Sequence, residues 1–111
     1  MDRLRSDFWV SAQLSQTQAM GLFSFVVKKG DPERGGIIIK HAPLNGTAQL
    51  FERSVDFDDN VVWRQLGPEG GEAEAKADER LKRRLSFDPD VWIVEIEDPQ
   101  NIYQLDAPLL V

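Results

Sequence analysis

The sequence predicts an α+β domain in which two helices pack on a mainly antiparallel sheet of about five to six strands. Two segments repeat apolar residues at helical spacing, several others alternate or are rich in β-branched residues, and turn-forming residues separate them. The predicted order is one helix, four strands, a second helix and two strands. A chain of 111 residues supports one hydrophobic core, so we predict a single domain over residues 1–111.

Residues 7–20 are predicted to form the first helix, because Val10 and Leu14 lie one helical turn apart. Either Ser6 or Asp7 is expected to cap the amides that are free at the start of this helix. The glycine that follows residue 20 is typical of a helix end.

The next segment, residues 22–29, changes to the alternation of a strand, which places Phe23, Phe25 and Val27 on one face. A second strand is predicted from the β-branched run that begins at Ile37. Because the segment between these two strands is dense in glycine and other turn residues, we expect the strands to pair as a hairpin.

Two further strands are predicted over residues 47–53 and 61–66. Asn45 and Gly46 both tolerate positive φ, so they predict a tight turn that leads into the third strand. The first three strands would then form a meander.

Residues 72–85 form the clearest predicted helix, because apolar residues recur at every fourth position. The first turn is acidic and the last turn is basic, which complements the helix dipole. The apolar stripe consists of Ala73, Ala77, Leu81 and Leu85. Ion pairs at i, i+4 spacing are expected between Glu72 and Lys76, Asp78 and Lys82, and Glu79 and Arg83.

The last two strands are predicted over residues 91–97 and 102–105. Pro89 disfavours helix at the residue before it, so the chain is expected to turn there. A second turn is predicted at Asp98, between the two strands.

Composition excludes several classes of protein. The chain is 41% hydrophobic and 29% charged, which is typical of a globular domain. It contains no cysteine, so disulfides, thiolate metal sites and a cysteine nucleophile are excluded. The apolar runs are too short for a membrane span or a signal peptide, which predicts a cytoplasmic protein. A net charge of −6 makes nucleic acid and anionic lipid unfavourable partners.

Three stretches of the sequence are distinctive when taken together: Leu4-Arg-Ser-Asp-Phe-Trp-Val-Ser-Ala12, Val26-Val-Lys-Lys-Gly-Asp-Pro32 and Phe87-Asp-Pro-Asp-Val-Trp-Ile-Val-Glu-Ile-Glu-Asp98. Through these stretches the whole chain resembles a family of short bacterial proteins of unknown function, DUF1491. The resemblance implies a single-domain fold and a cytoplasmic bacterial setting, and it implies no activity, ligand or catalytic residue.

The densest group of carboxylates lies near the end of the chain and is the candidate metal site. In a strand, Glu95 and Glu97 point to the same face, so they could share a hard cation such as magnesium. The alternative is that both glutamates face water while the intervening apolar residues fill the core, and the nearby aspartates bond backbone amides around the proline turn. The group consists of Asp88, Asp90, Glu95, Glu97 and Asp98.

His41 is the only histidine and shares a strand face with Ile37 and Ile39. It could act as a general base, or it could be a partly buried, hydrogen-bonded histidine at the rim of the core. Trp9, Trp63 and Trp92 are expected to anchor the core, and any one of them would mark an interface if it were exposed.

Two other charged groups have simpler explanations. The acidic stretch around Asp56 lacks the glycine and the later glutamate of a calcium loop, so we interpret it as a solvated turn. The basic group at the end of the second predicted helix matches the helix dipole and has no interleaved aromatic residue for base stacking. It consists of Arg80, Lys82, Arg83 and Arg84.

These patterns favour a non-catalytic binding or adaptor module with a protein partner, because they include no catalytic constellation and no cofactor motif. One alternative is a small metal-dependent enzyme that uses the carboxylates near Glu95, with or without His41. A second alternative is a nucleic-acid-associated protein that uses the basic group. The sequence predicts no cofactor.

Overall fold

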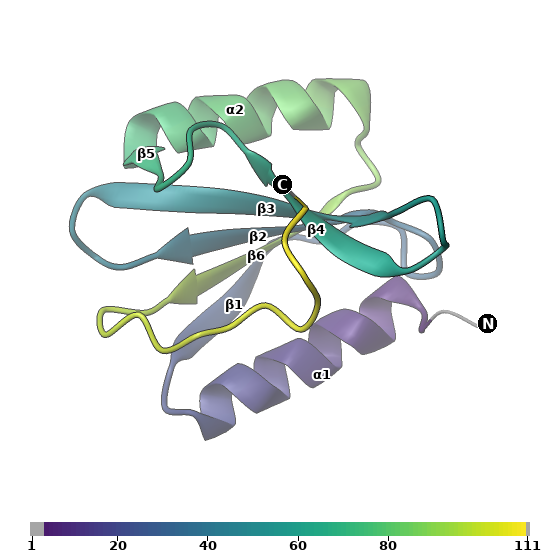
Figure 1. Ribbon diagram of the computed structural model, residues 1–111, viewed down its shortest axis with the longest axis horizontal. Coiled ribbons are helices and arrows are strands. Elements are labelled where there is room, and N and C mark those ends of the chain that lie inside the picture. Colours follow the sequence, from purple (N-terminus) through teal and green to yellow (C-terminus); the bar gives the residue numbers. More distant parts are fainter. Residues whose placement is uncertain (1–3, 111) are drawn as a thin grey trace.

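The computed structural model describes residues 4–110, which form a twisted sheet with one helix on each face (Figure 1). The strands are β1 (Phe23–Lys28), β2 (Ile37–Ala42), β3 (Thr47–Val55), β4 (Val61–Leu66), β5 (Glu72–Ala73) and β6 (Trp92–Glu97). They are hydrogen-bonded in the order β1-β6-β2-β3-β4, and the short β5 pairs with β3. β2 and β6 run parallel, whereas the other pairs are antiparallel. The predicted α+β class is therefore confirmed.

The predicted hairpin between β1 and β2 is wrong, because β6 lies between these strands and pairs with both. The meander is formed instead by β2, β3 and β4. Burial explains this order. All six residues of β2 are buried, and β6 is apolar on both faces at Ile93 and Val94, so both strands belong in the interior of the sheet. β1 has an exposed Phe23 and lies at the edge.

The helix α1 (Ser6–Ala19) packs on β1 and β6 and buries one side of itself, including Trp9 and Val10. Thr17 lies on the same side, and its hydroxyl is 2.6 Å from that of Ser24 on β1. This pair of hydroxyls explains why β1 turns a polar residue toward the helix, since each buried hydroxyl satisfies the other.

The start of α1 is held differently from the prediction, because neither candidate side chain caps it. The amides of Ser6 and Asp7 donate to the carbonyls of Glu33 and Pro32, and the Ser6 hydroxyl donates to the carbonyl of Gly35 at 2.6 Å. The loop before β2 therefore supplies the acceptors that a capping side chain would otherwise provide.

The helix α2 (Glu74–Phe87) covers the other face of the sheet with Ala77 and Leu81. It begins two residues later than predicted, because Glu72 and Ala73 pair with β3 as β5. Most of its ion pairs join the helix to the sheet instead of following the expected i, i+4 pairs. They are Glu72 with Arg80, Glu74 and Asp78 with Lys40, and Arg84 with Glu52. One i, i+4 contact joins Arg84 to Asp88 at 3.8 Å, and this pair is not among those expected.

The predicted strand over residues 102–105 does not form. The chain after β6 instead runs in an extended path across the α1 face of the sheet, drawn in yellow in Figure 1. Tyr103 and Leu105 pack against the core on that face. Near the end, the amide of Trp63 donates to Pro108 and the amide of Leu110 donates to Trp63, so this segment shields the edge of β4.

Neither helix within residues 4–110 combines the length and the apolar composition that a bilayer-spanning helix requires.

Candidate functional site

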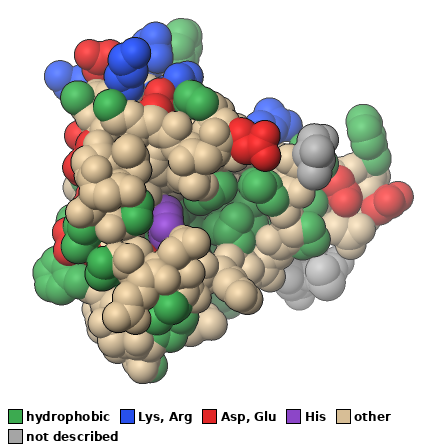
Figure 2. All heavy atoms as spheres, turned by 60° about the vertical axis from the view of Figure 1, so that its left-hand side comes forward, with side chains coloured by type: hydrophobic (Ala, Val, Ile, Leu, Met, Phe, Trp, Pro, Cys, Tyr) green, Lys and Arg blue, Asp and Glu red, His purple; other side chains and the backbone are tan. Residues whose placement is uncertain are grey.

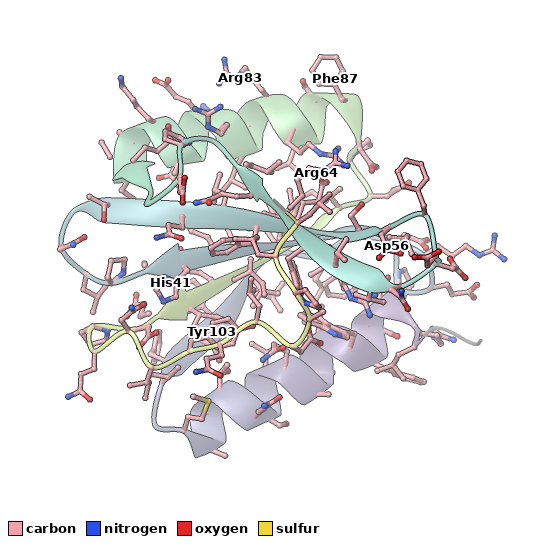
Figure 3. The ribbon with its side chains drawn as sticks, in the orientation of Figure 1. His41, Asp56, Arg64, Arg83, Phe87 and Tyr103 are labelled. Atoms are coloured by element: carbon pink, nitrogen blue, oxygen red, sulfur yellow. The ribbon has the colours of Figure 1, made fainter. Side chains whose placement is uncertain are left out.

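His41 is almost completely buried near the end of β2. Its Nε2 lies 2.8 Å from Oδ2 of Asp98, and its ring stacks on Tyr103 with the centroids 6.3 Å apart. Figure 2 shows His41 in a hollow of the surface, and Figure 3 shows the ring above Tyr103. The expected hydrogen-bonded histidine is confirmed, and it is more deeply buried than the partly buried position that the sequence predicts.

Asp98 has no exposed surface and accepts three hydrogen bonds. Besides His41, the amides of Ile102 and Tyr103 donate to its carboxylate at 3.0 and 2.8 Å. Burial by itself would raise the pKa of Asp98, but these hydrogen bonds outweigh it and lower the pKa below the ordinary value. Asp98 therefore stays ionised and anchors the chain where it leaves β6, a role that counting carboxylates did not reveal.

Glu95 faces the ammonium of Lys40, which lies 3.4 Å away and is buried under α2. Glu74 and Asp78 contact the same ammonium at 2.8 and 2.9 Å. Burial lowers the pKa of Lys40, but the hydrogen bonds to these two residues and the charge of Glu95 outweigh it, so the pKa is raised. The expectation that Glu95 faces water is therefore wrong, because its side chain is only 14% exposed and lies beside a cation.

The position of Glu95 beside Lys40 also concerns the candidate metal site, which includes Glu95. Burial is the main cause that raises the pKa of Glu95, and Glu97 lies on the same face of β6. Among residues 4–110, no group of three or more histidine, cysteine or acidic side chains is placed to hold a metal ion. Shared metal binding by Glu95 and Glu97 stays an untested prediction.

Trp9 and Trp63 are buried against each other, with ring centroids 5.6 Å apart. Both indole nitrogens donate to one carboxylate, Asp106, at 3.1 and 2.8 Å. The two tryptophans therefore anchor the core, as expected, and they also hold the C-terminal segment. The only signal of this role in the sequence is a single acid between Leu105 and Ala107.

The basic group on α2 is divided by its contacts. Arg80 bonds Glu72 at 2.7 and 3.0 Å, and Arg84 bonds Glu52, so both face the sheet. Lys82 and Arg83 are exposed, and Figure 3 shows Arg83 on the outer side of α2. The four residues do not form one basic surface.

The acidic stretches are turns, as expected. The Asp56 carboxylate accepts the amides of Asp58 and Asn60 at 2.9 Å. The Asp88 carboxylate accepts the amide of Asp90 at 3.1 Å.

A hollow of about 650 Å³ lies where α1 begins. Its rim carries both signs of charge, because Glu33 lies beside Arg34 and Arg5 is paired with Asp7 at 3.2 Å. Because acidic and basic side chains lie side by side around the hollow, its charge favours neither anionic nor cationic ligands.

Five of the twelve exposed large apolar side chains among residues 4–110 lie around the open edge of the sheet, in a region that we call the edge surface. One side of β1 pairs with β6, and the other side pairs with no strand among residues 4–110. Phe23 and Val27 on this strand are 65% and 50% exposed, and Phe25 packs on Phe23 with ring centroids 5.5 Å apart. The edge surface consists of Met20, Phe23, Phe25, Val27, Leu44 and Ile102.

A groove of about 330 Å³ lies at one end of the edge surface, between the end of α1 and the turn after β6. Met20, Phe23, Leu44 and Ile102 line it, together with the carboxylate residue Glu97. Four large apolar side chains around one groove are more than scattered surface residues would produce.

Leu44 has a φ of 65°, which is a strained conformation for a branched side chain. The predicted turn at Asn45 and Gly46 forms, but the positive φ angles fall on Leu44 and Gly46. This conformation occurs at a residue that is 59% exposed in the groove.

Alternation correctly placed Phe23 and Phe25 on one face, opposite Glu97 and Glu95 of β6, but the register of β1 shifts at Val27, where the alternation ends. Alternation also could not show that this face of β1 adds no residue to the core under α2. The core cluster under α2 includes Ile38 of β2 and Ile93 of β6, and it includes no residue of β1. An apolar face at a sheet edge looks the same in sequence as one that faces the core.

Comparisons with known proteins agree with this fold. A crystal structure of a DUF1491 family protein from Caulobacter crescentus is 33% identical, with a TM-score of 0.86, and the match covers 97% of this chain and 100% of that chain. The NMR structure of a DUF1491 family protein from the same organism is 32% identical, with a TM-score of 0.84 and 100% coverage of both chains. A solution structure of a protein from A. tumefaciens is 25% identical, with a TM-score of 0.76, and the match covers 96% of this chain and 100% of that one.

No curated protein matches the chain. The family model described as "Protein of unknown function (DUF1491)" matches residues 4–106, which is nearly the whole sequence. The resemblance in the three stretches of sequence is thereby confirmed, and this chain belongs to the DUF1491 family.

Proposed function

We propose that this domain is a non-catalytic binding module that docks a protein partner on the edge surface. The observation that carries the proposal is the gathering of exposed apolar side chains along β1 and around the groove. Strands with an unpaired edge accept a further strand through main-chain hydrogen bonds, and apolar pockets beside the edge supply specificity.

The contrast between the two edges of the sheet supports this choice. The edge of β4 is shielded by the C-terminal segment through hydrogen bonds of Trp63 with Pro108 and Leu110. The edge of β1 has no such cover among residues 4–110. Along β1, the described residues therefore offer a partner unpaired backbone groups beside exposed apolar side chains.

The setting that we propose is the bacterial cytoplasm. The solved relatives come from Caulobacter crescentus and A. tumefaciens, which supports a bacterial source. The absence of cysteine is compatible with a reducing compartment.

The test is affinity purification from the native cell at low salt, with tagged wild-type chain and two variants as bait. Phe23→Ser removes the most exposed aromatic side chain of β1, and Phe57→Ser removes a fully exposed phenylalanine from the loop after β3. We expect a protein that wild-type and Phe57→Ser recover equally and that Phe23→Ser recovers at least about tenfold less, because a buried aromatic anchor dominates binding. If the tagged bait recovers the cell's own untagged copies of this chain, those copies count as the protein partner. The proposal is wrong if the three baits recover the same proteins in the same amounts.

The metal-dependent alternative has less support, because the ammonium of Lys40 lies where a cation would approach Glu95. Thermal unfolding with and without divalent cations separates the two proposals. A cation at about 100 times its dissociation constant adds about 2.7 kcal/mol of stability, so a metal site would give a clear rise in Tm. We expect no rise with magnesium, calcium, manganese or zinc.

A further inference from the structure

We infer that Asn45 is a site of spontaneous deamidation, and that Thr47 assists the reaction. The inference does not depend on the proposed function, because it concerns a reaction of the chain with water. Asn45 lies in the turn between β2 and β3, which projects from one end of the sheet (Figure 1). Asn45 and Gly46 are both exposed, so water reaches the two residues that react.

The residue after Asn45 supplies the nucleophile. Once the amide of Gly46 has lost its proton, its nitrogen attacks Cγ of Asn45 and closes a succinimide ring. Within the described part of the chain this amide donates to no acceptor, and a Cβ added to Gly46 would meet no atom within 4 Å. Glycine also has more backbone freedom than any other residue, so the turn can bring the nitrogen to Cγ.

The side-chain carbonyl of Asn45 is polarised by two donors from one residue. Its Oδ1 accepts the backbone amide of Thr47 at 3.1 Å and the hydroxyl of Thr47 at 2.6 Å. Negative charge develops on this oxygen as the nitrogen adds to Cγ, and donors that already point at the oxygen lower the barrier. The turn therefore carries both the nucleophile and the donors that stabilise the intermediate.

Water is the only co-reactant. As the bond between the Gly46 nitrogen and Cγ forms, the bond between Cγ and Nδ2 breaks, and Nδ2 leaves as ammonia after taking a proton from solvent. Water then opens the succinimide at either of its carbonyls, which leaves aspartate or isoaspartate at position 45. The net change is the loss of ammonia and the gain of one water.

Both products change the surroundings of this turn. Each adds a negative charge to a chain whose net charge is already −6. Isoaspartate also lengthens the main chain, because the backbone then passes through Cβ of residue 45. The carbonyl of Gly46 accepts the amide of Glu74 at 3.0 Å, and Leu44 lines the groove of the edge surface. The reaction therefore alters a backbone segment that contacts the start of α2 on one side and the groove on the other.

The first experiment follows folded wild-type chain over days at neutral and mildly alkaline pH by peptide mass spectrometry. Asn60 and Asn101 are internal controls, because the branched residues Val61 and Ile102 follow them and crowd the attacking nitrogen. We expect Asn45 to lose its amide at least about tenfold faster than either control, and faster still as the pH rises. Equal retention of the amide at all three positions would overturn the inference.

The second experiment tests the assistance by Thr47 in the folded chain. Thr47→Val removes the hydroxyl and keeps the branched shape, whereas Thr47→Ser keeps the hydroxyl. We expect Thr47→Val to slow the loss of the Asn45 amide at least about threefold, because one of two donors to Oδ1 is gone. Thr47→Ser should react at the wild-type rate, and circular dichroism checks that both variants are folded. Equal rates in the two variants would show that the hydroxyl gives no assistance.

Discussion

At the scale of single residues, three charged side chains organise this protein, the buried Asp98 and Lys40 and the exposed Asp106, and each has a separate structural role. Asp98 holds His41 and two backbone amides, Asp106 holds two indoles, and Lys40 gathers three carboxylates under α2. Buried charges persist only where they are paired, so the contacts of Asp98 and Lys40 account for charges that would otherwise destabilise the core.

The clearest residue prediction concerns Asp98. Asp98→Asn keeps the shape of the side chain but removes the charge that accepts bonds from His41 and the amide of Tyr103. We expect the free energy of unfolding to fall by about 2 kcal/mol at neutral pH in urea titrations. Asp90→Asn, at an exposed position, is the control and should change it little.

The pH dependence of the same variant gives an independent check. Because the folded state lowers the pKa of Asp98, this group stabilises the fold above its unfolded value of about 3.9. That contribution is lost as the pH falls through the lower folded value. Wild-type chain should therefore lose its advantage over Asp98→Asn in acid, and an unchanged difference between the two at low pH would contradict this account.

At the scale of elements, the C-terminal segment behaves as a third cover on the sheet, although it forms no regular strand. It is tied at its start by Asp98 and near its end by Asp106 and the backbone of Trp63. Leu105 and Tyr103 fill the space between these ties against the core. The C-terminal segment stays in place only through these few contacts, because it forms no regular strand and lacks a continuous series of backbone hydrogen bonds.

Removing one tie should release the end of this segment. Asp106→Ala leaves the indoles of Trp9 and Trp63 without their acceptor, which should destabilise the fold by about 2 kcal/mol. Hydrogen exchange should become at least about tenfold faster at the amides of Trp63 and Leu110, which bond within the tied region. Asp58→Ala, in the exposed loop after β3, serves as the control. Unchanged exchange at both amides would show that Asp106 is not the tie.

At the scale of the whole molecule, the last strand along the chain occupies the interior of the sheet. β6 pairs with β1 on one side and with β2 on the other, and four of its six residues are buried. The sheet is therefore incomplete until residues near the end of the chain are present, and β1 can join it only through β6.

This topology predicts the effect of truncation. A chain that ends at Asp90 lacks β6, so β1 and β2 lose their common neighbour, and circular dichroism should show an unfolded or largely unfolded chain. A chain that ends at Pro108 keeps β6 and both ties of the C-terminal segment to side chains, and it should stay folded. Cooperative folding of the shorter chain would show that β6 is dispensable.

Local pattern was sufficient for most elements. The periodicity of α2, the alternation of β6 and the turn at Gly46 depend on neighbouring residues, and the structure has them within a few residues of the expected bounds. The predictions failed where a segment distant in the sequence determines the local structure. Glu72 joins β3 instead of α2, and the start of α1 is bonded by the loop before β2.

The sequence by itself determined the α+β class, the two helices, five of the strands and the burial of the tryptophans, because these follow from short-range periodicity and the sorting of apolar from charged side chains. Only the tertiary structure decided that β6 separates β1 from β2, that Asp98 meets His41, and that the apolar face of β1 stays uncovered. Each of these depends on which distant segments come together, and the spacing of residues along the chain does not encode that choice directly.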